Sequence, residues 1–232
     1  MRRLGLIGGM SWESSIEYER LINQVVRRHR GGVASADLLI RSFDFSEVEN
    51  LQSSGRWEEA GRLLAEAGKQ LESIGAEALV LCTNTMHQVA DQVIDATHIP
   101  LLHIVQATGE KILETSCRKP LLLGTAYTME KPFYREALQA DFPLDVITPR
   151  KDEREIVHRI IYDELVRGIV SESSRSEMLR IIDRAVTEEE ADGVIAGCTE
   201  IELLVSADHL SAPYFPTTAI HAEYAANWSL GE

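Results

Sequence analysis

The sequence lacks the features of membrane-spanning, nucleic-acid-binding and disulfide-stabilised proteins. No apolar run approaches the roughly 20 residues that a helix needs to cross a bilayer. With 23 Lys and Arg against 37 Asp and Glu, the net charge is −14, which disfavours nucleic acid because phosphate binding needs a basic face. Three widely spaced cysteines do not make a disulfide framework, so we expect a reducing, cytoplasmic location.

The chain also lacks the motifs of nucleotide and metal binding. Gly8 and Gly9 open a loop between a predicted strand and helix, but Glu13 stands where GxGxxG needs its last glycine. There is no CxxC pair to accompany Cys82 and His87, so we expect no metal. A phosphatase loop would need an arginine where Gln88 stands. The glycine loop is either a carboxylate cradle or a simple turn.

Short β-branched apolar runs alternate with longer amphipathic stretches, a pattern typical of an α/β protein with mainly parallel sheets flanked by helices. A hydrophobic share of 44% over 232 residues is enough for one large core or two smaller ones. Strands are predicted at residues 4–8, 37–42, 78–82, 101–104, 121–124, 144–147, 193–196 and 214–215. Helices are predicted at residues 14–29, 57–74, 85–96, 129–139, 152–170, 174–189 and 219–228.

The two halves of the chain repeat one another. Cys82 and Cys198 each end an apolar run and are each followed by Thr, and the offset of 116 positions between them also separates Gly8 from Gly124. This repeat predicts two similar domains, residues 1–98 with 210–232 and residues 99–209. The last strand and helix have no counterpart in the predicted repeat, and we expect them to complete the first domain.

Two thiols at equivalent strand ends favour proton-transfer chemistry. The carboxyl ends of parallel strands line ligand crevices, and the helix start after Cys82 should lower the pKa of its thiol. A single cysteine at such a position could simply be a small buried apolar residue. The recurrence of Cys-Thr in both halves favours a catalytic role instead. Two opposed thiols suit moving a proton from one face of a carbon to the other. Cys117, near a predicted helix end, has no predicted role.

At these residues the sequence resembles the aspartate/glutamate racemase family, the cofactor-independent amino-acid racemases. It is most similar to the bacterial branch that acts on both aspartate and glutamate. The resemblance covers nearly the whole chain and rests on Gly8-Gly9-Met10-Ser11-Trp12-Glu13-Ser14, Cys82-Thr83-Asn84-Thr85-Met86-His87 and Gly197-Cys198-Thr199-Glu200-Ile201, with Asp44-Phe45, Phe215-Pro216-Thr217-Thr218 and His221-Ala222.

The resemblance implies two pseudo-twofold-related domains with the active site in the interdomain cleft, and a homodimer. It implies a small acidic amino acid as substrate and no pyridoxal phosphate or other cofactor. One cysteine would act as thiolate base at Cα while the other thiol protonates the opposite face. The substrate-binding residues that it implies are Met10, Gln52, Thr83, Asn84, Thr85 and Thr199.

The substrate's side-chain carboxylate should meet a cation. The family pattern often has a lysine in the segment that matches residues 164–168, where this chain has Arg167. Arg41, at the end of the second predicted strand, is another candidate. Because arginine differs from lysine in geometry and reach, the preference between aspartate and glutamate stays open.

Two other functions stay open. One is a related isomerase, racemase or decarboxylase acting on another small carboxylate or a hydantoin; two cysteines favour a two-base reaction over a decarboxylase, which needs one proton donor. The other is a non-catalytic protein that binds an acidic metabolite. Such a protein needs a binding site but not two thiols, so cysteine reactivity separates the two classes.

Overall fold

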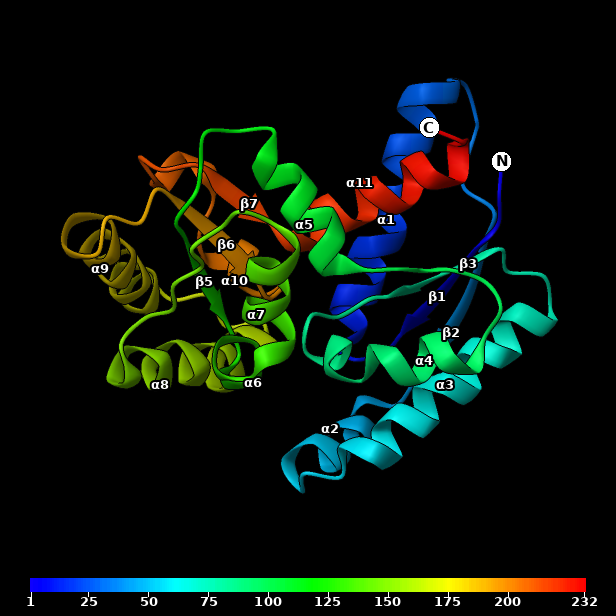
Figure 1. The fold of residues 1–232 in the computed structure, drawn as a ribbon, viewed down its shortest axis with the longest axis horizontal. Coiled ribbons are helices and arrows are strands. Elements are labelled where there is room, and N and C mark those ends of the chain that lie inside the picture. Colours follow the sequence, from blue (N-terminus) through cyan, green and yellow to red (C-terminus); the bar gives the residue numbers. More distant parts are fainter. The chain divides into compact units, whose positions relative to one another are not determined.

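The computed structural model describes all residues, Met1–Glu232, and they form two compact units. Unit 1 contains Met1–Ile104 and Thr218–Glu232, and unit 2 contains Val105–Thr217. Each unit has one sheet of parallel strands flanked by helices (Figure 1). The predicted α/β class with parallel sheets is confirmed.

The sheet of unit 1 has the order β2-β1-β3-β4. Its strands are β1 (Leu4–Gly8), β2 (Leu38–Ser42), β3 (Ala78–Leu81) and β4 (Leu101–Leu102), and every neighbouring pair is parallel. The helices of this unit are α1 (Trp12–Arg30), α2 (Phe45–Ser53), α3 (Trp57–Ser73), the 3₁₀ helix η1 (Thr85–Val89), α4 (Ala90–Ala96) and α11 (Thr217–Leu230).

Alternation along the strands gives this sheet two buried faces, because successive side chains point to opposite sides. Val80 and Cys82 lie in the core cluster with residues of α1 and α11. Leu79 and Leu81 lie in a second cluster with residues of α3 and α4. In Figure 1, α1 and α11 accordingly cover one face of the sheet, and α3 and α4 cover the other. The Cys82 side chain therefore points to the α1 and α11 face.

The sheet of unit 2 has the order β5-β6-β7, again parallel, with β5 (Pro120–Gly124), β6 (Gly193–Gly197) and β7 (Tyr214–Pro216). Leu121, Leu123, Val194, Ala196 and Cys198 share one core cluster with residues from α8, α9 and α10. The helical elements are α5 (Ile104–Leu113), α6 (Ala126–Glu130), α7 (Pro132–Asp141), α8 (Lys151–Arg159), the π-helical η2 (Ile160–Glu164), η3 (Leu165–Arg167), α9 (Glu172–Glu188), α10 (Ile201–Leu204) and η4 (Ala207–His209).

The division of the chain differs from the predicted one at both boundaries. Residues 101–102 form β4, which pairs with β3 and so belongs to the first sheet. The prediction that the last strand returns to the first domain is wrong, because β7 pairs with β6 in the second sheet. Helix α11 does return, and the Arg2 backbone N–H donates to the Ser229 carbonyl at 2.8 Å.

The repeat is more complete than the sequence alone indicated. In unit 1, β1 pairs with β3 and β3 with β4; in unit 2, β5 pairs with β6 and β6 with β7. β7 is thus the counterpart of β4. Helix α5 follows β4 but belongs mostly to unit 2, and α11 follows β7 but belongs mostly to unit 1. In the chain, one helix of each unit therefore directly follows the last strand of the other unit.

Three predicted elements are modified in the structure. The predicted helix at 129–139 is interrupted where Pro132 begins α7, since proline starts helices but does not continue them. The predicted helix at 152–170 ends in the π and 3₁₀ turns of η2 and η3. The predicted strand at 144–147 is reduced to one bridge, from Ile147 to Leu121.

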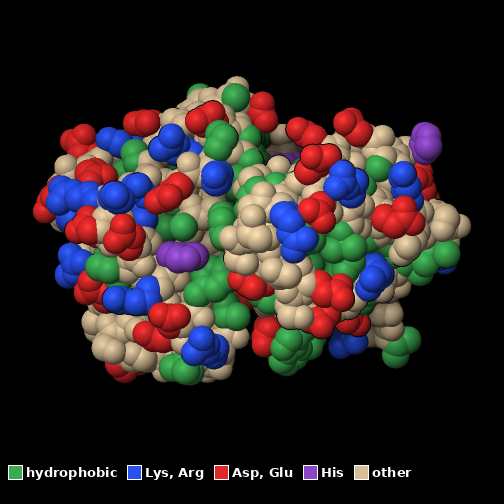
Figure 2. Space-filling view, turned by 90° about the horizontal axis from the view of Figure 1, so that it is seen from below, with side chains coloured by type: hydrophobic (Ala, Val, Ile, Leu, Met, Phe, Trp, Pro, Cys, Tyr) green, Lys and Arg blue, Asp and Glu red, His purple; other side chains and the backbone are tan.

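None of the helices combines the length and the apolar character needed to cross a membrane. On the face seen in Figure 2, acidic and basic side chains are interspersed and no broad basic patch is present.

Candidate active site

Cys82 lies directly after β3, beside the glycine loop that follows β1. Its backbone N–H donates to the Ile7 carbonyl at 2.9 Å, and its side chain is fully buried. A Cβ on Gly8 would lie 4.0 Å from the Cys82 Cβ. Gly9 has a φ of +81°, and a Cβ there would lie 2.2 Å from the Phe43 nitrogen. The loop therefore requires glycine to pass close to β2 while reaching Cys82.

The residues after Cys82 and the predicted pocket-lining residues are buried in the same unit. Thr83, Asn84 and Thr85 are all buried where the chain leaves β3 for η1. Gln52, on α2, places its Nε2 2.9 Å from the Met86 Sδ. Met10 lies in the same core cluster as Met86. Unit 1 thus gathers five of the predicted substrate-binding residues around the segment that carries Cys82.

A buried histidine network fixes the backbone next to Cys82. His87 Nδ1–H donates to the Thr83 carbonyl at 2.8 Å, and its Nε2 accepts from the Ile104 N–H at 3.3 Å. The His87 ring lies 4.6 Å from that of His103, centroid to centroid. With both ring nitrogens used, His87 is held as one neutral tautomer. It joins the turn after β3 to the start of α5.

His221, on α11, extends this network. Its Nε2–H donates to the Leu102 carbonyl at 2.7 Å, and its Nδ1 accepts from the Tyr18 hydroxyl at 2.8 Å. Burial lowers the pKa of His221 to about 4, and burial also lowers the pKa of His87 well below its usual value. Both rings therefore stay neutral at physiological pH.

Acid should destabilise the protein through these two rings. An unfolded histidine takes up its proton at about pH 6.5, whereas folded His221 does so at about 4. The unfolded state thus binds more protons in this window, and stability falls as the pH falls. We expect His221→Gln to be less stable at neutral pH but to lose ~2 kcal/mol less than the unmodified protein between about pH 7 and about pH 4.5. Urea unfolding measures the free energy of unfolding at both pH values. An equal loss of stability in the two proteins between these pH values would contradict the prediction.

The Cys82 thiol does not have the lowered pKa that its position before a helix predicted. Burial raises the pKa of this thiol above its ordinary value. The cause is local: Cys82 points into the core cluster with α1 and α11, and its Sγ makes a long contact of 4.0 Å with the Val80 carbonyl. Desolvation of the thiolate therefore outweighs the helix start, which is the short 3₁₀ helix η1.

Cys198 occupies the equivalent position in unit 2, directly after β6. It is buried, and its thiol donates to Glu200 Oε2 at 3.0 Å. Burial, and after it the Glu200 carboxylate, raise the pKa of this thiol. The preceding strand end is braced by Thr217, whose hydroxyl donates to the Ala196 carbonyl at 2.7 Å. Thr199, the predicted partner of a substrate carboxylate, lies between Cys198 and Glu200 in the chain and is half-buried.

The two arginine candidates lie at the surface of their units. Arg41 is exposed, donates from Nη1 to the Ser42 carbonyl at 2.5 Å and stacks its guanidinium 4.4 Å from the Phe43 ring centroid. Arg167 ends η3 and is exposed. Through this stacking Arg41 touches the core cluster of Met10 and Met86, to which Phe43 belongs, and the one hydrogen bond of its guanidinium goes to the Ser42 carbonyl. No group of three or more His, Cys, Asp or Glu side chains is arranged to hold a metal.

Comparison with known proteins places these features in context. The model of the Asp/Glu/hydantoin racemase family matches residues 7–225. A crystal structure of a Yersinia pestis protein considered to be an Asp/Glu racemase shares 50% identity over 99% of this chain and 100% of its own, with a TM-score of 0.94. An aspartate racemase homologue from Pyrococcus horikoshii shares 33% identity over 99% of this chain and 100% of its own, with a TM-score of 0.88.

A curated relative is more distant. The broad specificity amino-acid racemase RacX of Bacillus subtilis is 22% identical over 161 residues, which are 67% of this chain. The match spans 65% of the length of RacX.

Proposed function

Because the chain belongs to the Asp/Glu/hydantoin racemase family, we propose that it racemises aspartate, glutamate or both without a cofactor, using Cys82 and Cys198 as two bases. The observation that carries this proposal is the equivalence of the two thiols. Each is buried, follows the strand that pairs with the first strand of its sheet, and precedes a threonine. One thiol for each face of a substrate's Cα is what a two-base racemase needs.

In this proposal the thiolate of one cysteine removes the Cα proton, and the thiol of the other delivers its proton to the opposite face. The C–H electron pair stays on Cα between the two steps, and the roles exchange in the reverse direction. Burial raises the pKa of both thiols, so a thiolate formed at either position is a strong base. A stronger base is better matched to the weakly acidic Cα–H of an amino acid.

The substrate would be held through its two carboxylates. In this proposal the substrate's α-carboxylate accepts hydrogen bonds from Thr83, Asn84, Thr85 and Thr199 and from the backbone N–H groups of their turns. Met10 and Gln52 line the pocket. The side-chain carboxylate would be met by Arg41 or Arg167, each of which could approach from an exposed position. Both thiols must stay reduced, which fits the cytoplasmic location that the cysteine count predicts.

Chiral chromatography of L-aspartate and L-glutamate incubated with the purified, reduced protein and no added cofactor tests this function. We expect the D-enantiomer of at least one to accumulate toward an equal mixture. If neither amino acid is converted while a hydantoin or another small carboxylate is, the substrate assignment is wrong. If the protein binds an acidic amino acid but does not convert it, it is a binding protein and not an enzyme.

A further inference from the structure

The two halves of the protein differ in charge two positions after each thiol. The offset of 116 that relates Cys82 to Cys198 also relates Asn84 to Glu200. Beside Cys82 the repeat thus has a neutral amide, and beside Cys198 it has a carboxyl group. Glu200 is buried and its Oε2 lies 3.0 Å from the Cys198 Sγ. The two thiols are equivalent in position but not in electrostatic environment.

The surroundings of Cys198 increase this difference. Glu202, two positions beyond Glu200 on α10, adds a second acidic group that opposes a negative charge on the Cys198 sulfur. Tyr214, from β7, is the other titratable group that interacts with Cys198. The rest of the core cluster around Cys198 is apolar. Around Cys82, burial is the single cause that raises the thiol pKa.

We propose that Glu200 is a further residue of the catalytic site, whose carboxylate accepts the hydrogen bond of the Cys198 thiol and keeps the proton on Cys198 in the resting protein. This rests on the proposed function. It makes Cys198 the proton donor of the resting pair and Cys82 the thiol that ionises first, because a Cys198 thiolate would face a carboxylate at hydrogen-bond distance.

The protons balance in both directions. When Cys82 is the base, its thiolate forms an S–H bond with the Cα proton, and the Cys198 S–H bond breaks to give its proton to the opposite face. The new Cys198 thiolate lies beside the Glu200 carboxylate, which favours its return to the thiol. It takes one proton from water while Cys82 gives one proton to water, and the starting pair is restored. In the reverse direction the Cys198 thiolate removes the Cα proton and becomes the thiol, and the Cys82 S–H bond breaks to give its proton to the opposite face.

Thiol alkylation without substrate tests this directly. In a Cys82→Ser, Cys117→Ser background Cys198 is the single thiol, and its reaction with iodoacetamide follows the thiolate fraction. We expect Glu200→Gln, which removes the charge but keeps the shape, to raise the alkylation rate about tenfold at about pH 8, because a one-unit fall in pKa is tenfold in thiolate. Glu202→Gln is the control: Glu202 lies on α10, the short helix that begins after its N-cap residue Glu200, and this variant should raise the rate much less.

A second variant moves the carboxylate to the other half. In a Cys198→Ser, Cys117→Ser background, Asn84→Asp should slow alkylation of Cys82 at the same pH. Circular dichroism of every variant verifies that it is folded. An unchanged or slower Cys198 reaction in folded Glu200→Gln overturns the proposal, and so does a Glu202→Gln effect as large as that of Glu200→Gln.

Racemisation supplies a separate readout. In the otherwise unmodified protein, Glu200→Gln should shift the pH profile of kcat toward lower pH, because the Cys198 thiol then ionises more readily, whereas Glu202→Gln should leave the profile nearly unchanged. The alkylation result does not depend on any substrate. Failure of the protein to racemise acidic amino acids therefore overturns the proposed function, while failure of the alkylation test overturns the role of Glu200.

Discussion

Serine at either Cys82 or Cys198 is expected to lower racemisation of acidic amino acids by at least ~10³-fold, because each thiol performs its own proton transfer. A serine hydroxyl is a far weaker acid and, at neutral pH, is not ionised to a useful extent. The fold should survive, since serine is close to cysteine in size and each site lies at a strand end. The measurement is the initial rate of conversion of L-aspartate and L-glutamate by each variant.

Cys117→Ser is the matched control. Cys117 is also a buried cysteine, but it lies near the amino ends of β5 and β6, at the opposite end of the sheet from Cys198. Its thiol donates to Asp192 Oδ1 at 3.0 Å, a bond that a serine hydroxyl can replace. We expect this variant to keep full activity. Full activity in Cys82→Ser or Cys198→Ser would end the two-base assignment.

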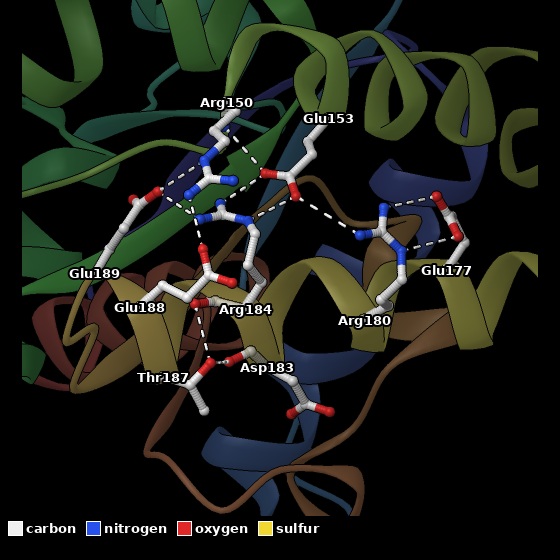
Figure 3. Close-up of polar contacts among 9 residues, drawn as sticks. All are labelled: Arg150, Glu153, Glu177, Arg180, Asp183, Arg184, Thr187, Glu188 and Glu189. Atoms are coloured by element: carbon white, nitrogen blue, oxygen red, sulfur yellow. Dashed lines mark hydrogen bonds and ion pairs between the residues drawn. The ribbon is translucent and has the colours of Figure 1, made fainter.

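The substitution Arg184→Met should destabilise the protein by ~3 kcal/mol, because it leaves the buried carboxylate of Glu153 without its cation. Arg184, on α9, donates from Nε to Glu153 Oε1 at 2.7 Å and from Nη2 to Glu153 Oε2 at 2.6 Å (Figure 3). The two side chains are 9% and 4% exposed. Glu153 also accepts from the Arg150 N–H at 3.1 Å, which caps the start of α8. The ion pair of Arg184 and Glu153 therefore joins α8 to α9, two helices that contribute residues to the core cluster containing Cys198.

Arg180→Met provides the comparison in the same network. Arg180 lies one turn earlier on α9, approaches Glu153 Oε1 at 3.9 Å and is 54% exposed, so its loss should destabilise the protein far less than the loss of Arg184. Urea unfolding of both variants measures the difference. Replacing both Arg184 and Glu153 by methionine should recover much of the loss, because no charge is then left buried. If Arg184→Met costs no more than Arg180→Met, this pair is not what holds the two helices together.

Much of the fold followed from local sequence patterns. The strand at residues 4–8 is β1 with the same bounds, and the strand at 193–196 is one residue shorter than β6. Such strands are buried on both faces and flanked by glycine, which makes their apolar runs easy to recognise. The helix Phe45–Ser53 was not predicted, because it is short and has two buried positions, Val48 and Gln52, in a largely polar segment.

Sequence patterns predicted only part of the candidate active site. The two thiols were found through the repeat, but the effect of burial on their pKa depends on which core face each side chain enters. Sequence spacing said nothing of the bond from His87 to Thr83, since that bond depends on the turn at η1. His221 reaches Leu102 across 119 positions of sequence. The contrast between Asn84 and Glu200 was visible in the repeat, and its importance emerged only with the 3.0 Å contact to Cys198.

The most direct test of two-base racemisation is the position of solvent deuterium early in the reaction. L-aspartate and L-glutamate are incubated with the protein in D2O, the enantiomers are separated at low conversion, and Cα deuterium is measured in each by proton NMR and mass spectrometry. With one thiol for each face, the D-product carries deuterium and the recovered L-substrate keeps its Cα proton. Equal deuterium in the recovered substrate and the product, or a product that retains the substrate's proton, would show that one base serves both faces and would contradict the assignment of Cys82 and Cys198.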